Sequence, residues 1–513
     1  DADESKMEEL GEFPEINREN LPEIARYFGE TINSQIRREQ LSLIVERTQT
    51  IPRFVELFRQ SEDLDDTQAL LNIYVIIKTI FSFSKFSVFE ALLNDDYLLE
   101  IIGILEYNSA LPERIHHRKI VESSKMIEII PFSNPTLRDL IIHTHRLQYL
   151  QDIVLPTPSI FEERGSFLSS FVFFRKNEIM EMIFEDKNFL SELFSLLGEE
   201  ITDENVKKNF LKFIVEICNF SRILQTEQKE MFMSKLLNYD VLNCLEKLKD
   251  LSGCDLKVSV VDVLFRIADT HPDVVRQGLL SSSNSQSNLL SYLCSLIIKT
   301  PETNNSLLAV QVIKVILDIS INVPKELEQK TVNNQFLTSF YTEPINALMA
   351  PLYSYTLSIP LIEKSFTLAL AIENILEILL ICVSCHTYHI KNYLFKNDTL
   401  KNITTLVSSK FAFLAHGAIR VLRRTLCNSD EFYSRYLSRE LILDRVFDVL
   451  VDHRTSYDVV HSAIIELFEF LRVSNNRALC VEVVERRRLD FESISFVTTF
   501  KKLVSFVDSY LSE

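Results

Sequence analysis

Apolar residues recur along this chain at the spacing of one helix face. A pattern of five apolar positions at offsets 0, 4, 7, 8 and 11 fits a helix of 3.6 residues per turn. The pattern begins at Ala69, Val206, Leu256, Leu308, Leu368, Phe411 and Val460. From Val206 onward the starts lie 43–60 residues apart, near the roughly 40–47 residues of armadillo and HEAT units. Such units bury their apolar faces only by stacking. The pattern therefore predicts an all-α fold, an armadillo/HEAT-like α-solenoid of stacked helical repeats; the alternative is a non-repeating helical domain.

Proline and polar segments interrupt this pattern at defined places. Five of the 14 prolines lie in residues 112–158 and five more in residues 301–360. Because proline breaks helix interiors, these two stretches are predicted to hold longer connections. Residues 281–288 contain only Ser, Asn and Gln and are predicted to form a loop. Residues 1–30 carry ten acidic against three basic residues, so we expect an acidic flexible arm over residues 1–20.

Composition narrows the possible functions. Glycine occurs only 8 times in 513 residues, so phosphate-binding loops and β-hairpins are disfavoured. The net charge of −18 opposes direct nucleic-acid binding. No common catalytic or nucleotide-binding motif occurs, and we expect no enzyme activity and no cofactor. The most apolar window, residues 366–385, is interrupted by Glu373, Asn374 and Glu377, so we expect no membrane association. Scattered cysteines suggest reduced thiols rather than disulfides.

Two groups of potential metal ligands favour a structural interpretation. Cys382, Cys385 and His386 have the form of a haem attachment site, and His389 adds a fourth ligand type. One unbroken helix cannot bring all four side chains to one ion, so we expect small buried cysteines at a helix end and no metal site. The pair at residues 143 and 145 is likewise expected on a helix face that packs Leu147 and Leu150 while presenting polar groups.

Basic residues suggest a surface for a partner protein. Arg420, Arg423 and Arg424 share one helix face, and arginine and tyrosine are common interface anchors. The alternative is that Asp430 and Glu431 simply pair with these arginines. A second basic run, residues 486–488, is expected to be a solvated face.

Longer blocks of this sequence resemble the SMEK family, regulatory subunit 3 of protein phosphatase 4. The blocks span roughly residues 70–510. They are Glu106-Tyr107, Leu111-Pro112, His117-Arg118, Ile129-Ile130-Pro131, His145 to Leu150, Ser170 to Phe174, Phe189 to Phe194, His386 to Tyr393, Phe413 to Ala415, Arg423-Arg424, Asp430 to Tyr436 and Ile465 to Phe470.

This resemblance implies a non-catalytic scaffold subunit of the protein phosphatase 4 complex. Its expected partners are the catalytic subunit, which supplies metals and catalysis, a second regulatory subunit, and phosphoprotein substrates. Location in the nucleus and cytoplasm and a role in the DNA damage response are also implied. The family usually begins with an EVH1/PH-like domain, which nothing before residue 20 could form, and ends in a charged tail. We therefore expect the helical core alone.

The resulting division has three parts: the arm at 1–20, SMEK-type helical repeats at 21–200, and armadillo/HEAT-like repeats at 201–513 that continue the same solenoid. The candidate partner-binding residues are Tyr388, His389, Lys391, Arg420, Arg423, Arg424, Tyr433 and Arg435. Another armadillo/HEAT cargo-binding adaptor, such as a nuclear-transport or signalling scaffold, remains the alternative function.

Overall fold

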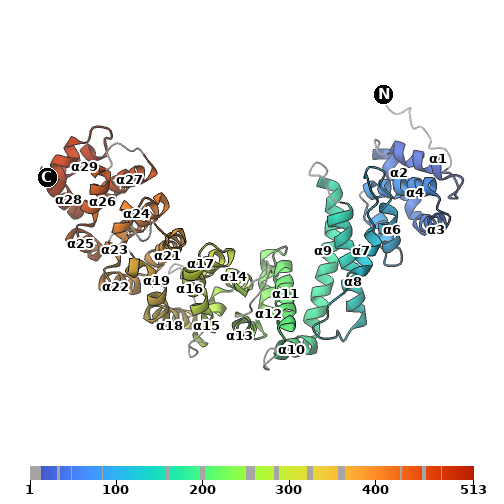
Figure 1. The fold of residues 1–513 in the computed structure, drawn as a ribbon, viewed down its shortest axis with the longest axis horizontal. Helices are drawn as coiled ribbons and strands as arrows, with labels where there is room; N and C mark the ends of the chain where they lie inside the picture. Colours follow the sequence, from blue (N-terminus) through green and yellow to red (C-terminus); the bar gives the residue numbers. More distant parts are fainter. Residues whose placement is uncertain are drawn as a thin grey trace. The chain divides into compact units, whose positions relative to one another are not determined.

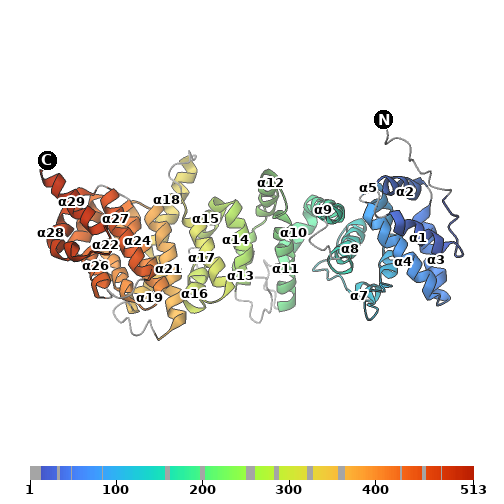
Figure 2. The ribbon, with the colours of Figure 1, turned by 90° about the horizontal axis from the view of Figure 1, so that it is seen from above.

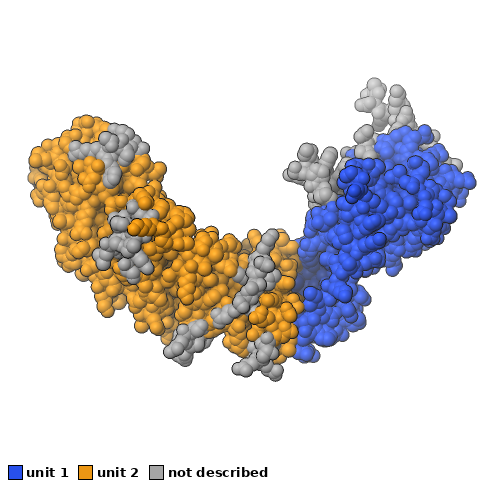
Figure 3. Space-filling model, in the orientation of Figure 1, with its two compact units in different colours: residues 1–193 blue, residues 194–513 orange. Residues whose placement is uncertain are grey.

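The computed structural model describes most of the chain, and every regular element in the described residues is a helix. Described are residues 13–31, 35–47, 49–83, 85–155, 162–196, 203–249, 260–281, 288–319, 327–355, 364–427, 430–452, 458–474 and 476–512. The chain divides into two compact units, residues 1–193 and 194–513 (Figure 3). The predicted all-α class is therefore confirmed. Most of the predicted arm, residues 1–12, and most of the predicted loop, residues 282–287, lie outside the described residues.

Unit 1 contains the first helices of the chain (Figure 1). They are α1 (Leu21–Thr31), α2 (Gln35–Arg47), α3 (Thr50–Asp63), α4 (Thr67–Ile80), η1 (Phe81–Phe83), α5 (Phe86–Leu92), α6 (Leu98–Leu105), α7 (His117–Ser123), α8 (Pro135–Tyr149), the π-helix η2 (Leu150–Val154), α9 (Glu162–Glu185) and α10 (Lys187–Leu196), which runs past the boundary at residue 193.

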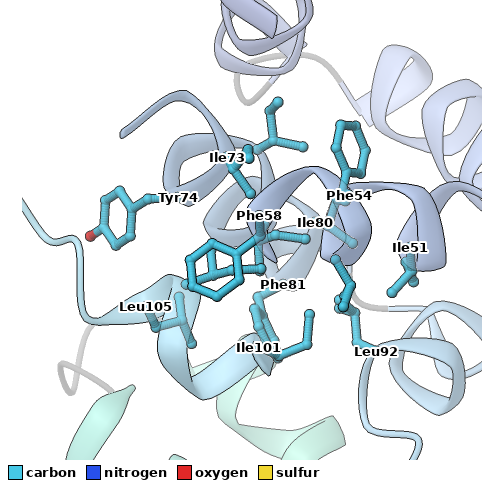
Figure 4. Packing of buried hydrophobic residues seen from close by; sticks show 14 of the residues in the cluster. Ile51, Phe54, Phe58, Ile73, Tyr74, Ile80, Phe81, Leu92, Ile101 and Leu105 are labelled. Carbon is cyan, nitrogen blue, oxygen red and sulfur yellow. The ribbon is translucent and has the colours of Figure 1, made fainter. Parts of the chain in front are cut away.

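An apolar cluster holds the first helices of unit 1 together. Phe54 and Phe58 of α3 lie among Ile73 and Ile80 of α4 and Ile101 of α6 (Figure 4). All five side chains are fully buried, and burial of each such side chain contributes about 1.5–3 kcal/mol. This packing explains why the apolar pattern that begins at residue 69 folds as α4.

A network of charged side chains around the buried Glu106 lies beside this cluster, with the Arg118 guanidinium over the ring of Phe58. The side chain of Glu106 is 2% exposed; its Oε1 accepts the backbone N–H of Arg118 at 2.7 Å, and its Oε2 accepts Arg114 at 2.8 Å. Arg118 also pairs with Glu62 of α3 at 2.9 Å. Burial alone would raise the pKa of Glu62, but the hydrogen bond and charge of Arg118 hold it below its usual value. The network fastens the segment after α6 to α3.

Unit 2 contains the remaining helices. They are α11 (Glu204–Ser221), α12 (Thr226–Leu237), α13 (Val241–Leu248), α14 (Val260–Thr270), α15 (Pro272–Ser281), α16 (Leu289–Lys299), α17 (Asn304–Leu317), α18 (Leu327–Thr342), α19 (Pro344–Tyr355), α21 (Phe366–Cys385), α22 (Tyr388–Lys396), α23 (Thr399–Thr405), η4 (Leu406–Ser408), α24 (Ala412–Cys427), α25 (Glu431–Arg439), α26 (Ile442–Asp452), α27 (Val459–Val473), α28 (Arg477–Ser493) and α29 (Thr499–Ser512).

The helices of unit 2 stack in three layers. In the first layer α11, α14, α17, α21, α24 and α27 pack in succession, and Figure 1 shows them along one side of the unit. In the second layer α15 packs on α18, α18 on α22, and α25 on α28. In the third layer α16, α19, α23 and α26 follow one another. Figure 2 shows these helices crossing the long direction of the unit. This repeated three-helix order is the predicted solenoid of stacked repeats.

The apolar pattern of the sequence marks the first layer. The starts at Val206, Leu308, Leu368, Phe411 and Val460 fall on or directly before α11, α17, α21, α24 and α27. The start at residue 256 lies outside the described residues, although the pattern continues into α14. Residues 301–360, for which the prolines predicted longer connections, also contain α17, α18 and α19, and Pro351 lies inside α19.

The first-layer helix α21 has the length and apolar composition that a membrane span requires. Within unit 2, however, 56% of its most apolar window is buried, and it packs against α17 and α24. A central helix of a folded array meets the same length and composition criteria.

Candidate functional site

The predicted partner-binding residues fall on two layers of unit 2. The three arginines lie on α24 in the first layer, whereas the other residues lie on α22 and α25 in the second layer. The second-layer residues are Tyr388, His389 and Lys391 on α22 and Tyr433 and Arg435 on α25. The residues predicted as one surface thus belong to two neighbouring layers of unit 2.

A ladder of opposite charges crosses the first layer. Lys314 of α17 lies 3.2 Å from Glu377 of α21, and Arg420 of α24 pairs with the same carboxylate. Arg423 lies 2.9 Å from Glu466 of α27. We call these five residues the charge ladder. Burial alone would raise the pKa of Glu377, but Lys314 and Arg420 hold it below its usual value. Partly exposed pairs of this kind contribute about 0–1 kcal/mol each, so the ladder chiefly fixes the register of neighbouring helices.

Arg424 stands apart from the ladder. Its Nε donates a hydrogen bond to Ser384 Oγ at 2.7 Å, and in the described part of the chain it has no carboxylate partner. Ser384 in turn donates to the backbone carbonyl of Leu380 at 2.6 Å. The guanidinium of Arg424 is therefore oriented by a neutral hydroxyl, and among the described residues it forms no ion pair.

The acidic residues after α24 do not neutralise its arginines, contrary to the alternative considered from the sequence. Asp430 pairs with Lys391 at 2.7 Å, and Glu431 pairs with Arg435 at 2.5 Å. Asp430 also accepts the backbone N–H of Phe432 as the N-cap of α25. The carboxylates that pair with α24 come instead from α21 and α27, about 43 residues away in sequence.

The second-layer residues differ widely in exposure. Tyr388 is 69% exposed, whereas Tyr433 is 3% exposed and packs its ring against Phe395 at 5.5 Å. Tyr433 therefore supports α25 from within and does not offer a surface contact. Phe432, which the sequence analysis did not select, is 60% exposed and lies 4.6 Å from Lys391 Nζ. Its position next to the N-cap of α25 was the only signal for it.

The cysteine and histidine residues at the end of α21 have structural roles. Cys382 is buried as expected, whereas Cys385, the last residue of α21, is only partly buried. His386 Nε2 lies 2.7 Å from the carbonyl oxygen of Leu317, and Nδ1 lies 2.9 Å from Tyr341 Oη. Because a carbonyl can only accept, Nε2 carries the proton and Nδ1 accepts from the tyrosine. His389 instead stacks on Tyr341 with ring centroids 5.5 Å apart.

A buried arginine of α15 reaches the end of α17, which His386 also contacts. Arg276 of α15 is 1% exposed, and its guanidinium donates to the carbonyls of Ile316 at 2.8 Å and Asp318 at 3.2 Å. Carbonyls at a helix C-terminus lack partners inside the helix and carry partial negative charge. Arg276 and His386 together satisfy these groups, and we call the arrangement the α17 cap.

The α17 cap predicts a pH dependence of stability. Burial lowers the pKa of His386 to about 4, whereas an unfolded histidine titrates near 6.5. Between these values only the unfolded chain binds the proton, so stability is complete above pH 6.5 and falls as the pH drops toward 4. We expect this residue to account for about 2 kcal/mol of lost stability between pH 7.5 and pH 5. The measurement is urea unfolding followed by circular dichroism, since the chain has no tryptophan.

The control is His386→Gln, which retains a donor and an acceptor but does not titrate. Its stability should fall by about 2 kcal/mol less than that of the wild type over the same pH interval. An equal loss in both proteins would show that His386 does not govern the response.

Two further expectations need correction. His143 is 2% exposed on its side chain and pairs with Asp95, so it is buried rather than presented, although Leu147 and Leu150 pack as expected. The run at residues 486–488 is an ion-paired contact rather than a solvated face. Arg486 and Arg487 each lie 3.1 Å from Asp444, which is 5% exposed. The partner lies about 42 residues earlier, beyond any local pattern.

Among the described residues no group of three or more His, Cys, Asp or Glu side chains is placed to hold a metal ion. What unit 2 offers is a face of charged side chains on the first layer and exposed aromatic rings on the second. Both are typical of protein-binding surfaces.

Known proteins match nearly the whole length of this chain. The family model described as phosphatase 4 regulatory subunit 3 matches residues 23–509. The chain is 32% identical over 507 residues to serine/threonine-protein phosphatase 4 regulatory subunit 3 of Drosophila melanogaster, covering 97% of this chain and 51% of that protein. It is 30% identical over 500 residues to Protein PPP4R3C1 of Mus musculus, and this match covers 94% of this chain and 61% of the mouse protein. The chain thus spans about half to three fifths of these relatives.

Solved structures show lower similarity. A designed armadillo repeat protein in complex with the peptide (KR)4 matches 55% of this chain and 98% of its own, with a TM-score of 0.36 and 14% identity. The match to an engineered protein covers 97% of this chain and 96% of that protein, with a TM-score of 0.37 and 12% identity.

Proposed function

Because the chain belongs to the phosphatase 4 regulatory subunit 3 family, we propose that it is a non-catalytic subunit that binds the catalytic subunit of protein phosphatase 4 and directs it to phosphoprotein substrates. The observation that supports this most directly is the extent of the family match, residues 23–509, which includes nearly all of both units. In this proposal the catalytic subunit supplies the chemistry, and the helical array supplies docking surfaces.

The docking surface in this proposal is the α24 face of the first layer. Arginine is enriched at the energetic centres of protein interfaces, and α24 presents three arginines on one face together with Phe470 of α27, which lies 4.3 Å from the Arg423 guanidinium. A second regulatory subunit would dock on the same array, and the complex would act in the nucleus and cytoplasm.

The test is the double substitution Arg423→Glu and Arg424→Glu in the full chain. We expect at least about 10-fold weaker binding of the catalytic subunit, because like charges or lost charge pairs at an interface cost several kcal/mol. Binding is measured by co-purification and by titration calorimetry with purified catalytic subunit. Circular dichroism checks that the variant is folded.

The matched control separates loss of the interface from loss of the ladder. Arg423→Glu places a carboxylate beside Glu466, so a second variant combines it with Arg424→Glu and Glu466→Arg to restore an internal pair. Both variants should lose the catalytic subunit. If the folded double variant still binds the catalytic subunit with wild-type affinity, the α24 face is not the docking surface.

A further inference from the structure

We propose that Arg424 alone among the α24 arginines receives a carboxylate of the docking partner, whereas Arg420 and Arg423 hold the first layer together. The inference rests on the proposed function and deepens it, because it names the chemistry that the α24 face recognises. The partner group is an Asp or Glu side chain that approaches the free edge of the Arg424 guanidinium.

Charge is unevenly distributed around α24. Helix α24 contains three arginines and no acidic residue. Arg420 faces Glu377 and also acts on Glu373, so acidic charge is abundant at its position. Arg423 has Glu466. Arg424 pairs with neither Glu377 nor Glu466, even though acidic residues outnumber basic ones in the chain, whose net charge is −18. In the described residues the cationic surplus of this face is therefore concentrated at Arg424.

The Arg424 side chain is held in one orientation by a hydrogen bond. Its Nε is already used by Ser384 Oγ at 2.7 Å, and that hydroxyl is itself fixed by its 2.6 Å bond to the Leu380 carbonyl. The two Nη nitrogens remain for another acceptor. They form a planar fork whose geometry matches the two oxygens of a carboxylate. The fork is thus held in place before the partner arrives, which reduces the entropy lost on binding.

Arg424 is also partly withdrawn from solvent. Arg424 is half-buried, on the last turn of α24 beside the last turn of α21. A cation that is partly withdrawn from water and meets only a neutral hydroxyl loses hydration without a compensating charge. An incoming carboxylate would supply that charge. By contrast, the pairs made by Arg420 and Arg423 are already complete, and a partner would have to break them.

The experiment measures the affinity of purified phosphatase 4 catalytic subunit for the full chain and for single variants. Arg424→Gln should weaken binding about 10–100-fold, because hydrogen bonds to charged groups are worth about 1.5–3 kcal/mol. Arg424→Lys should recover only part of this loss, since lysine keeps the charge but lacks the fork. Ser384→Ala should weaken binding by a few-fold through loss of orientation.

The matched control is Arg423→Gln, one position earlier on the same helix. It removes a ladder pair and should change affinity less than about 3-fold, since exposed pairs contribute little. Equal losses for Arg423→Gln and Arg424→Gln, or wild-type affinity for Arg424→Gln, would overturn the inference. Loss of binding after treatment of the catalytic subunit with alkaline phosphatase would also overturn it, because the recognised group would then be a phosphate. Failure of the wild-type chain to bind at all would instead contradict the proposed function.

Discussion

Replacing Arg276 by methionine is expected to lower the free energy of unfolding of unit 2 by about 3–5 kcal/mol. The methionine keeps much of the volume but removes the guanidinium donors that Arg276 directs at the end of α17, so that His386 alone of the α17 cap still donates there. The buried carbonyl of Ile316 would then lose its bond, as would the partly buried carbonyl of Asp318. A buried unsatisfied polar group costs about 1–3 kcal/mol, and Asp273 would lose its arginine partner as well. Hydrogen exchange of the α15 and α17 amides, followed by mass spectrometry, measures the effect.

The control for this substitution is Arg435→Met on α25. Arg435 is 72% exposed, and its one ion pair within the described residues is with Glu431 of the same helix, so its loss should cost less than about 0.5 kcal/mol. Arg276→Lys should lie between the two, because an ammonium group cannot reach several carbonyls at once. If the α15 and α17 amide hydrogens exchange at the same rates in the Arg276→Met and Arg435→Met proteins, the α17 cap does not stabilise the unit.

Replacing Glu106 by glutamine is expected to destabilise unit 1 by about 2–4 kcal/mol. The carboxylate accepts from two donors, the backbone N–H of Arg118 and the side chain of Arg114. A glutamine of the same shape must turn its own NH2 group toward one of these donors. The side chain is 2% exposed, so water cannot easily replace the lost acceptor. Hydrogen exchange of the α3 and α6 amides measures the change in the full chain.

Glu100→Gln provides the comparison within the same unit. Glu100 pairs with Arg59, which is 50% exposed, and loss of such a pair should cost at most about 1 kcal/mol. A Glu106→Gln protein that is as stable as Glu100→Gln would mean that the buried network is not what fastens this segment to α3. The prediction for unit 1 is independent of the one for unit 2.

The helical repeats could be predicted because their signal is local. Residues such as Ile73, Ile214 and Ile464 recur at helix spacing and are fully buried in the structure. The family resemblance, confirmed by the match over residues 23–509, rests on blocks that include the Glu106 network and the end of α21. The sequence did not reveal that a proline such as Pro351 would sit inside a helix, because tertiary packing overrides local preference there.

The candidate site was predicted only in part. Helix geometry predicts that the three α24 arginines share one face, and in the structure none of the three is among the buried residues of α24. Their partners could not be inferred, because Glu377 and Glu466 belong to neighbouring repeats. Burial of Arg276 was equally hidden, since its acceptors are backbone carbonyls that have no sequence signature. Interactions between repeats are set by the three-dimensional stack, whereas periodicity reports only the helices within each repeat.

The α17 cap has a consequence for how the array comes apart. In an ideal repeat protein each unit touches only its neighbours, and the array can fray one unit at a time. Here α15 and α21, on either side, both bind the last turn of α17. Melting of any one of the three removes bonds from the others, so this stretch should open in a single cooperative step. A proteolytic nick inside it would leave two fragments that remain associated and dissociate only on denaturation.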